Sequence, residues 1–122
     1  MANSDRNAQA TEKILFYCEK IETAVSRFGN TLEAFQADFD YRSVCAMYIM
    51  QIGELSTVLT DDFRAKYSGV PWRLIRGMRN VFAHDYHNMN VEETWNTIQT
   101  NIPELKSYCE VILRLEKLVN SD

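Results

Sequence analysis

Apolar side chains recur at helical spacing through almost the whole chain, and this periodicity restricts the possible fold more than any other feature. One pattern runs from Ile14 to Phe28, a second from Tyr41 to Leu59 and a third from Val91 to Leu115, each with the i, i+3, i+4, i+7 spacing of a helix face. No segment alternates with period two between hairpin signals, and only four glycines and two prolines interrupt the chain. The sequence therefore predicts an all-α fold, an antiparallel bundle of about four to five helices.

Turn and capping residues divide these patterns into separate helices. Gly29 ends the first pattern, and Thr60 with the two aspartates after it suits the start of a short helix. Asn30 and Asn90 each stand three residues before a glutamate, which is the spacing of a capping box. Pro71 suits the first position of a further helix. We expect helix starts at all of these places.

The length of 122 residues predicts a single domain. We expect a flexible polar segment over residues 1–10 and one helical domain over residues 11–119, with a kink or a new segment at Pro103. No apolar run approaches the roughly 18 to 20 residues that cross a bilayer, and the polar start does not resemble a signal peptide. The cytoplasm is the expected location.

Three cysteines, Cys18, Cys45 and Cys109, each fall at an apolar helical position without a close partner in the sequence. An odd number of cysteines at such positions indicates buried free thiols rather than a metal or redox centre. We therefore expect these residues in the core, and no metal site.

The formal net charge is −4, but the basic residues are concentrated in one stretch. A protein of this net charge does not coat nucleic acid through bulk electrostatics. Residues 63–84 nonetheless contain no carboxylate and five basic side chains, namely Arg64, Lys66, Arg73, Arg76 and Arg79. On the helix expected after Pro71, one face would be apolar, with Leu74, Ile75, Met78, Val81 and Phe82, and another would carry Arg73, Arg76 and Asn80, with Arg79 beside them. This cluster is either a solvated face or a surface that binds phosphates.

The string from Gly77 to Tyr86, GMRNVFAHDY, concentrates reactive side chains within a few residues. The imidazole of His84 titrates near neutral pH and can remove or supply a proton. The guanidinium of Arg79 offers a permanent charge and a planar fork for phosphoryl oxygens, and Asn80 can orient either group. Together these side chains match what metal-independent cleavage of a phosphodiester requires.

Helical geometry limits how this string can act. Asn80 and His84 share a helix face at i, i+4, whereas Arg79 and His84 lie about 140° apart at roughly 100° per residue. The helix must therefore end or bend before His84 if both residues serve one site. The same side chains also have ordinary structural roles, since a histidine at a helix end interacts with the helix dipole and Tyr86 can pack half-buried. Spacing alone leaves both interpretations open.

The motif resembles the signature of HEPN ribonucleases of the HepT type. Asn80 directly follows Arg79. Four residues separate Arg79 from His84, and Tyr86 stands two positions after His84. The similarity covers about residues 10–115. It also includes Ile52-Gly53-Glu54, Lys66-Tyr67, Pro71-Trp72, Ala83 and Ile102-Pro103-Glu104-Leu105.

The resemblance implies a metal-independent endoribonuclease toxin of a bacterial toxin–antitoxin pair, without a cofactor. Two chains would form a homodimer whose cleft joins two copies of the motif. His84 would act as general acid or base, Arg79 would stabilise the transition state, and Asn80 would position the phosphate or the imidazole. From their helical placement, we expect Arg73 and Arg76 to steer RNA phosphates towards the site.

The resemblance also implies a partner, a nucleotidyltransferase antitoxin of the MNT type (MntA-like), which would transfer AMP from ATP onto Tyr86. An adenylate two residues from His84 would place a charge and a purine where RNA must bind, and would compete with RNA for Arg79. Glu54 is either a helix-surface carboxylate or a group that supports the site or the dimer cleft. Two rival interpretations are a non-catalytic binding subunit of a nucleotidyltransferase and a structural helical adaptor.

Overall fold

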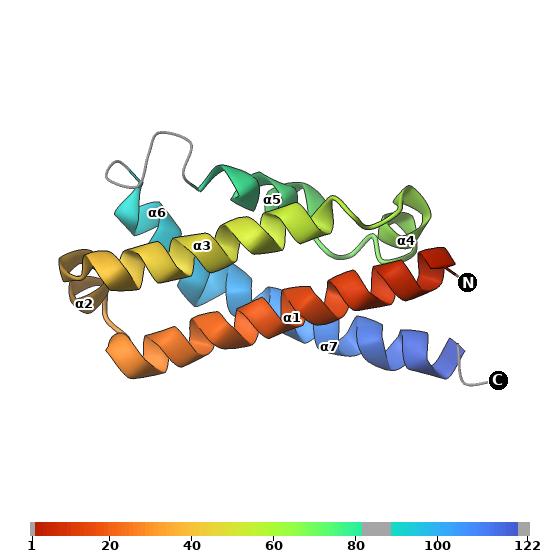
Figure 1. Ribbon diagram of the computed structural model, residues 1–122, viewed down its shortest axis with the longest axis horizontal. Helices are drawn as coiled ribbons and strands as arrows, with labels where there is room; N and C mark the ends of the chain where they lie inside the picture. Colours follow the sequence, from red (N-terminus) through yellow and green to blue (C-terminus); the bar gives the residue numbers. More distant parts are fainter. Residues whose placement is uncertain (1, 82–88, 120–122) are drawn as a thin grey trace.

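Three long helices form the body of the computed structural model, which describes residues 2–81 and 89–119, with side chains from residue 6. Helix α1 (Ala2–Phe28) packs against α3 (Phe39–Ser56) and α7 (Ile102–Val119), and it runs antiparallel to both (Figure 1). Every regular element in these two stretches is helical. The prediction of an all-α bundle is confirmed.

Short helices complete the bundle and divide it more finely than the sequence patterns indicated. These elements are α2 (Leu32–Ala37), α4 (Asp61–Lys66), α5 (Trp72–Gly77), a 3₁₀ turn η1 (Met78–Asn80), α6 (Val91–Asn96) and a π-helical turn η2 (Thr97–Asn101). Both α5 and η1 contact α3, and α2 contacts α3 and α6. The segment after Pro71 is therefore held against the second long helix (Figure 1).

The apolar faces of the long helices meet in one core. The fully or almost fully buried side chains include Ile14, Cys18 and Ile21 of α1, Cys45, Ile49 and Ile52 of α3, and Ile102, Leu105 and Cys109 of α7. All three cysteines are free and buried, as predicted. Burial raises the pKa of Cys45 and Cys109 to about 12 and shifts the pKa of Cys18 in the same direction, so these thiols stay protonated and unreactive at neutral pH.

Several predicted helix starts are confirmed, and one is corrected. The side chains of Thr60 and Asn90 each accept a hydrogen bond from the backbone N–H three residues later, at the starts of α4 and α6. The predicted cap at Asn30 is wrong, because Thr31 caps α2. Asn30 instead accepts a hydrogen bond from Gln99. Asn30 has the spacing of a helix cap, but the hydroxyl of the next residue, Thr31, accepts the capping hydrogen bond.

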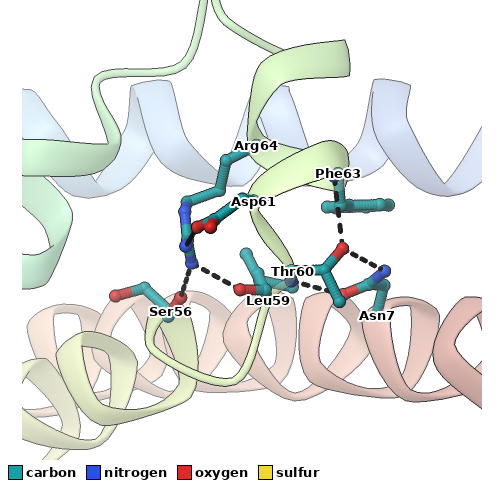
Figure 2. A network of polar contacts seen from close by, with 7 residues as sticks. All are labelled: Asn7, Ser56, Leu59, Thr60, Asp61, Phe63 and Arg64. Carbon is teal, nitrogen blue, oxygen red and sulfur yellow. Dashed lines mark hydrogen bonds and ion pairs between the residues drawn. The ribbon is translucent and has the colours of Figure 1, made fainter.

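The N-terminal stretch, which the sequence assigned to a flexible segment over 1–10, belongs to α1. The helix begins at Ala2, and Asn7 and Ala10 are buried. Asn7 donates to the Thr60 hydroxyl at 3.1 Å and accepts from the Thr60 N–H at 3.0 Å (Figure 2). The polar composition that suggested a free segment includes a side chain that joins α1 to the start of α4.

The predicted break near Pro103 takes the form of a π turn rather than a loop. Helical structure is continuous from Val91 to Val119, and the N–H of Ile102 bonds to the carbonyl of Thr97, five residues earlier. A wider turn next to a proline accommodates the missing N–H and the bulk of the ring. Among the residues described, none of the helices combines the length and the apolar content that a membrane span needs.

Glu116 is the buried carboxylate of α7, and it joins this helix to α4. It accepts hydrogen bonds from Lys66 Nζ at 2.8 Å and from the Tyr67 hydroxyl. Burial alone would raise the pKa of Glu116, but the two hydrogen bonds and the charge of Lys66 outweigh it and lower the pKa. A pKa below the unfolded value gives stability that is present above the unfolded pKa and is lost as pH falls through the folded one.

We therefore expect Glu116→Gln to lower the free energy of unfolding at pH 7 by about 1–3 kcal/mol. The difference from wild type should shrink below about pH 4, where the carboxylate of the unfolded chain is protonated. Urea unfolding at pH 7 and pH 3 measures both values. Glu110→Gln, at an exposed position of the same helix, is the matched control. An equal loss at both pH values would contradict the role of the ionised carboxylate.

Candidate functional site

Arg79 and Asn80 lie on the 3₁₀ turn η1, where both are exposed. The α-helix ends at Gly77, and the chain then tightens into η1, so Arg79 and Asn80 lie beyond the end of α5. Met78 is buried and anchors this turn in the core. His84 and Tyr86 lie outside the described residues. The structure thus describes the first half of the predicted motif.

Gly53 sets the position of Arg79 and is the residue that the sequence patterns did not identify as part of the site. It lies buried in α3, directly beneath the backbone of Arg79. A Cβ on residue 53 would stand 2.4 Å from the backbone nitrogen of Arg79 and 2.8 Å from the Cγ of its side chain, which is closer than real contacts allow. The signal in the sequence is an isolated glycine within a strongly helical apolar pattern, which usually has a packing reason. Glycine here allows η1 to rest on α3.

Glu54, the next residue of α3, forms an ion pair with Arg79. Its Oε1 lies 3.4 Å from Arg79 Nε, and the two side chains are 55% and 43% exposed. Because a pair at this exposure contributes only about 0–1 kcal/mol, it orients the guanidinium without binding it tightly. Arg79 Nε faces Glu54, and among the described residues the terminal nitrogens of Arg79 have no hydrogen bond or ion pair.

The basic stretch that the sequence indicated divides into two groups. Arg64 donates to the carbonyls of Ser56 and Leu59 and pairs with Asp61, as Figure 2 shows. Lys66 pairs with Glu116 at 2.8 Å. These two cations hold the loop before α4 and join α4 to α7.

Arg73 and Arg76 form the second group. Both are exposed on α5, and within residues 2–81 and 89–119 neither has an ion pair or a side-chain hydrogen bond. Leu74, which the sequence placed on the apolar face of this helix, is 50% exposed. It still shares the predicted apolar face, because Leu74, Met78 and Val81 line the cleft between α5 and α6, and Ile75 of the same helix is buried.

A cleft of about 670 Å³ opens between α5–η1 on one side and α6–η2 on the other. Its apolar wall contains Ile49, Leu74, Gly77, Met78, Val81 and Met89. Its polar wall contains Arg73, Asn80, Asn90, Glu93, Thr94, Thr97 and Asn101. Two predicted site residues, Arg73 and Asn80, thus line the cleft. Arg76 and Glu54 do not.

The arrangement suits the binding of a phosphate with an attached organic group. Arg79 offers a permanent charge, and the cleft beside its turn η1 offers polar and apolar surface. Among the described residues, no group of His, Cys, Asp and Glu side chains is arranged to hold a metal ion.

Comparison with known proteins gives one consistent match. Residues 14–112 match the family described as "Ribonuclease HepT-like". The chain is 37% identical over 106 residues to a "Putative RNase" of Caldanaerobacter subterraneus subsp. tengcongensis, covering 87% of this chain and 93% of that protein. It is 33% identical over 93 residues to a "Putative RNase" of Methanocaldococcus jannaschii, covering 69% and 85%.

A further relative is the "Probable ribonuclease HepT" of Thermococcus cleftensis, which is 36% identical over 59 residues, covering 48% of this chain and 54% of that protein. No solved structure matches the chain at a significant level.

Proposed function

Since the chain belongs to the HepT-like ribonuclease family, we propose that it is a HEPN-type endoribonuclease that cleaves RNA at a site containing Arg79 and His84. The observation that carries this proposal is the seating of Arg79. Gly53 allows its turn to rest on α3, Glu54 pairs with Nε of the guanidinium, and among the described residues the terminal nitrogens have no partner and would contact a phosphate. Arginine is suited to this contact because its planar fork matches two phosphoryl oxygens.

In the proposed reaction the ribose 2′-hydroxyl loses a proton and the departing 5′-oxygen gains one; His84 performs one of these transfers and water performs the other. The 2′-oxygen bonds to phosphorus as the bond from phosphorus to the 5′-oxygen breaks, which leaves a cyclic phosphate and a free 5′-hydroxyl. Arg79 stabilises the charge that develops on the phosphoryl oxygens, and Asn80 positions the phosphate or the imidazole. Glu54 acts through Arg79 as a positioning residue.

The proposal extends to the biological setting. The chain would act as a toxin and form a homodimer in which two copies of the motif share a cleft. Arg73 and Arg76, exposed on α5 and without partners among the described residues, would attract RNA phosphates to this dimer cleft. A nucleotidyltransferase antitoxin would control the activity.

The purified chain is expected to cleave RNA equally well with and without EDTA, because no step uses a metal ion. Expressed alone in bacteria, it should stop growth and fragment cellular RNA. Gel analysis of RNA and growth curves measure the two effects, and light scattering gives the oligomeric state. A folded chain that binds RNA and never cleaves it would instead support a non-catalytic binding subunit.

Tyr86 is the proposed point of control. Incubation with ATP and a nucleotidyltransferase of the MNT type is expected to add the mass of AMP and to abolish RNA cleavage, since the adenylate would occupy the phosphate position at Arg79. Intact-mass spectrometry measures the increment. Tyr86→Phe should remain unmodified and active in the same mixture. An increment that persists in this variant would place the modification elsewhere.

A further inference from the structure

We infer that the cleft between α5 and α6 binds an unpaired base of the RNA substrate beside the phosphate at Arg79, an inference that rests on the ribonuclease function proposed above. Met78 and Asn80, the residues on either side of Arg79, both line the cleft, whereas Arg79 itself does not. The cleft therefore opens beside the turn η1 that carries Arg79. Its volume of about 670 Å³ lies within the range of roughly 300–1,000 Å³ typical of ligand pockets, enough for a nucleotide.

The apolar wall suits the flat faces of a base. Leu74, which is 50% exposed, and Ile49, Met78 and Met89, which are almost fully buried, all line the cleft. Methionine adapts its shape to aromatic surfaces and makes favourable sulfur contacts with them. A sugar and a phosphate alone are polar and would leave this apolar surface exposed to water, whereas the faces of a base would bury it.

The polar wall suits the edge of a base. Asn80, Glu93 and Asn101 line the cleft from three elements, and none of their side chains has a hydrogen-bond partner among the described residues. The amides can donate and accept, but an ionised glutamate only accepts. A carboxylate therefore favours adenine, cytosine or guanine, which have an exocyclic amino group. The one Watson–Crick donor of uracil, N3–H, lies between two carbonyl oxygens that repel a carboxylate. Arg73 at the same cleft would contact a neighbouring phosphate.

A base in this position must be unpaired. In duplex RNA the bases are stacked and their Watson–Crick edges are occupied, so recognition of bases by a pocket requires a single strand, a loop or a bulge. The cleft would thus restrict the enzyme to single-stranded segments and give it a base preference at one position.

Binding of single nucleotides tests this inference without relying on cleavage. In the inactive background His84→Ala, titration with AMP, CMP, GMP and UMP is followed by NMR. At least one of the three amino-bearing nucleotides is expected to bind about tenfold more tightly than UMP, and Glu93→Gln should remove that preference. Glu92→Gln changes an exposed neighbour outside the cleft and is the matched control.

Cleavage maps of an unstructured RNA give the second measurement. Wild type and Asn96→Leu should cut with the same base preference, whereas Asn101→Leu should lose it, because Asn101 lines the cleft and Asn96 does not. Equal binding of all four nucleotides, or a preference unchanged by Glu93→Gln and Asn101→Leu, would overturn the base site. Selective binding by a wild type that cleaves no RNA would support the base site and overturn the proposed ribonuclease reaction.

Discussion

Replacing His84 with alanine is expected to lower the rate of RNA cleavage by about 10²–10⁴-fold, the usual contribution of a general acid or base. Within the GMRNVFAHDY string no second group titrates near neutral pH, so no other side chain of the motif replaces the imidazole. Single-turnover cleavage of a short RNA measures the loss, and a growth assay reports it in cells. The wild-type rate should also depend on pH around neutrality, and this dependence should vanish in the variant.

His87→Ala is the matched control, because His87 is the other histidine of the chain and lies three residues away. We expect it to retain the wild-type rate. A His84→Ala variant that cleaves as fast as wild type would refute the assignment, and equal losses in both variants would show that the segment matters but not the imidazole of His84.

The second large effect is expected from Gly53→Ala. The added Cβ would stand 2.4 Å from the Arg79 nitrogen and 3.0 Å from its Cα, so the backbone of η1 must move away from α3. Overpacking of this kind costs about 1–3 kcal/mol of stability. The displacement also moves the guanidinium from its place beside Glu54. We expect kcat/KM to fall by about 10²-fold, since a misplacement of roughly 1 Å at a reacting centre has such an effect.

Gly69→Ala is its control, because a Cβ on Gly69 would meet no atom within 4 Å. Its stability and activity should stay close to wild type. Chemical unfolding and steady-state cleavage, measured on both variants, separate the two effects. A Gly53→Ala variant that is destabilised but cleaves normally when folded would show that Gly53 serves packing alone.

Local rules predicted much of the fold. The apolar stripes of α1, α3 and α7 and the caps at Thr60 and Asn90 follow from residues within a few positions of one another. The N-terminal turns of α1 were missed because Asn7 has its hydrogen-bond partner at Thr60, far along the chain. From the sequence alone, a polar residue such as Asn7 is assigned to the solvent-exposed surface, because its hydrogen-bond partner far along the chain is not evident.

The sequence indicated only part of the candidate site, again because some of its contacts join residues that lie far apart in the chain. The string around Arg79 indicated phosphodiester chemistry, but the contact between Gly53 and Arg79 depends on the packing of η1 against α3. Nor did the sequence separate Arg64 and Lys66, which hold α4 in place, from Arg73 and Arg76. The cleft itself is formed by elements on both sides of the segment 82–88, so no local pattern describes it.

The π turn η2, ahead of Pro103, determines how α7 is rotated about the helix axis relative to α6. It therefore determines which side chains face the cleft and which face the core. Thr97 and Asn101 line the cleft, while Ile98 and Ile102 are buried in the core. Loss of one residue within Thr97–Asn101 would rotate α7 relative to α6 by about 100° and turn its apolar face out of the bundle. The chain can therefore vary side chains at the cleft, but the number of residues in this turn is fixed by the core behind it.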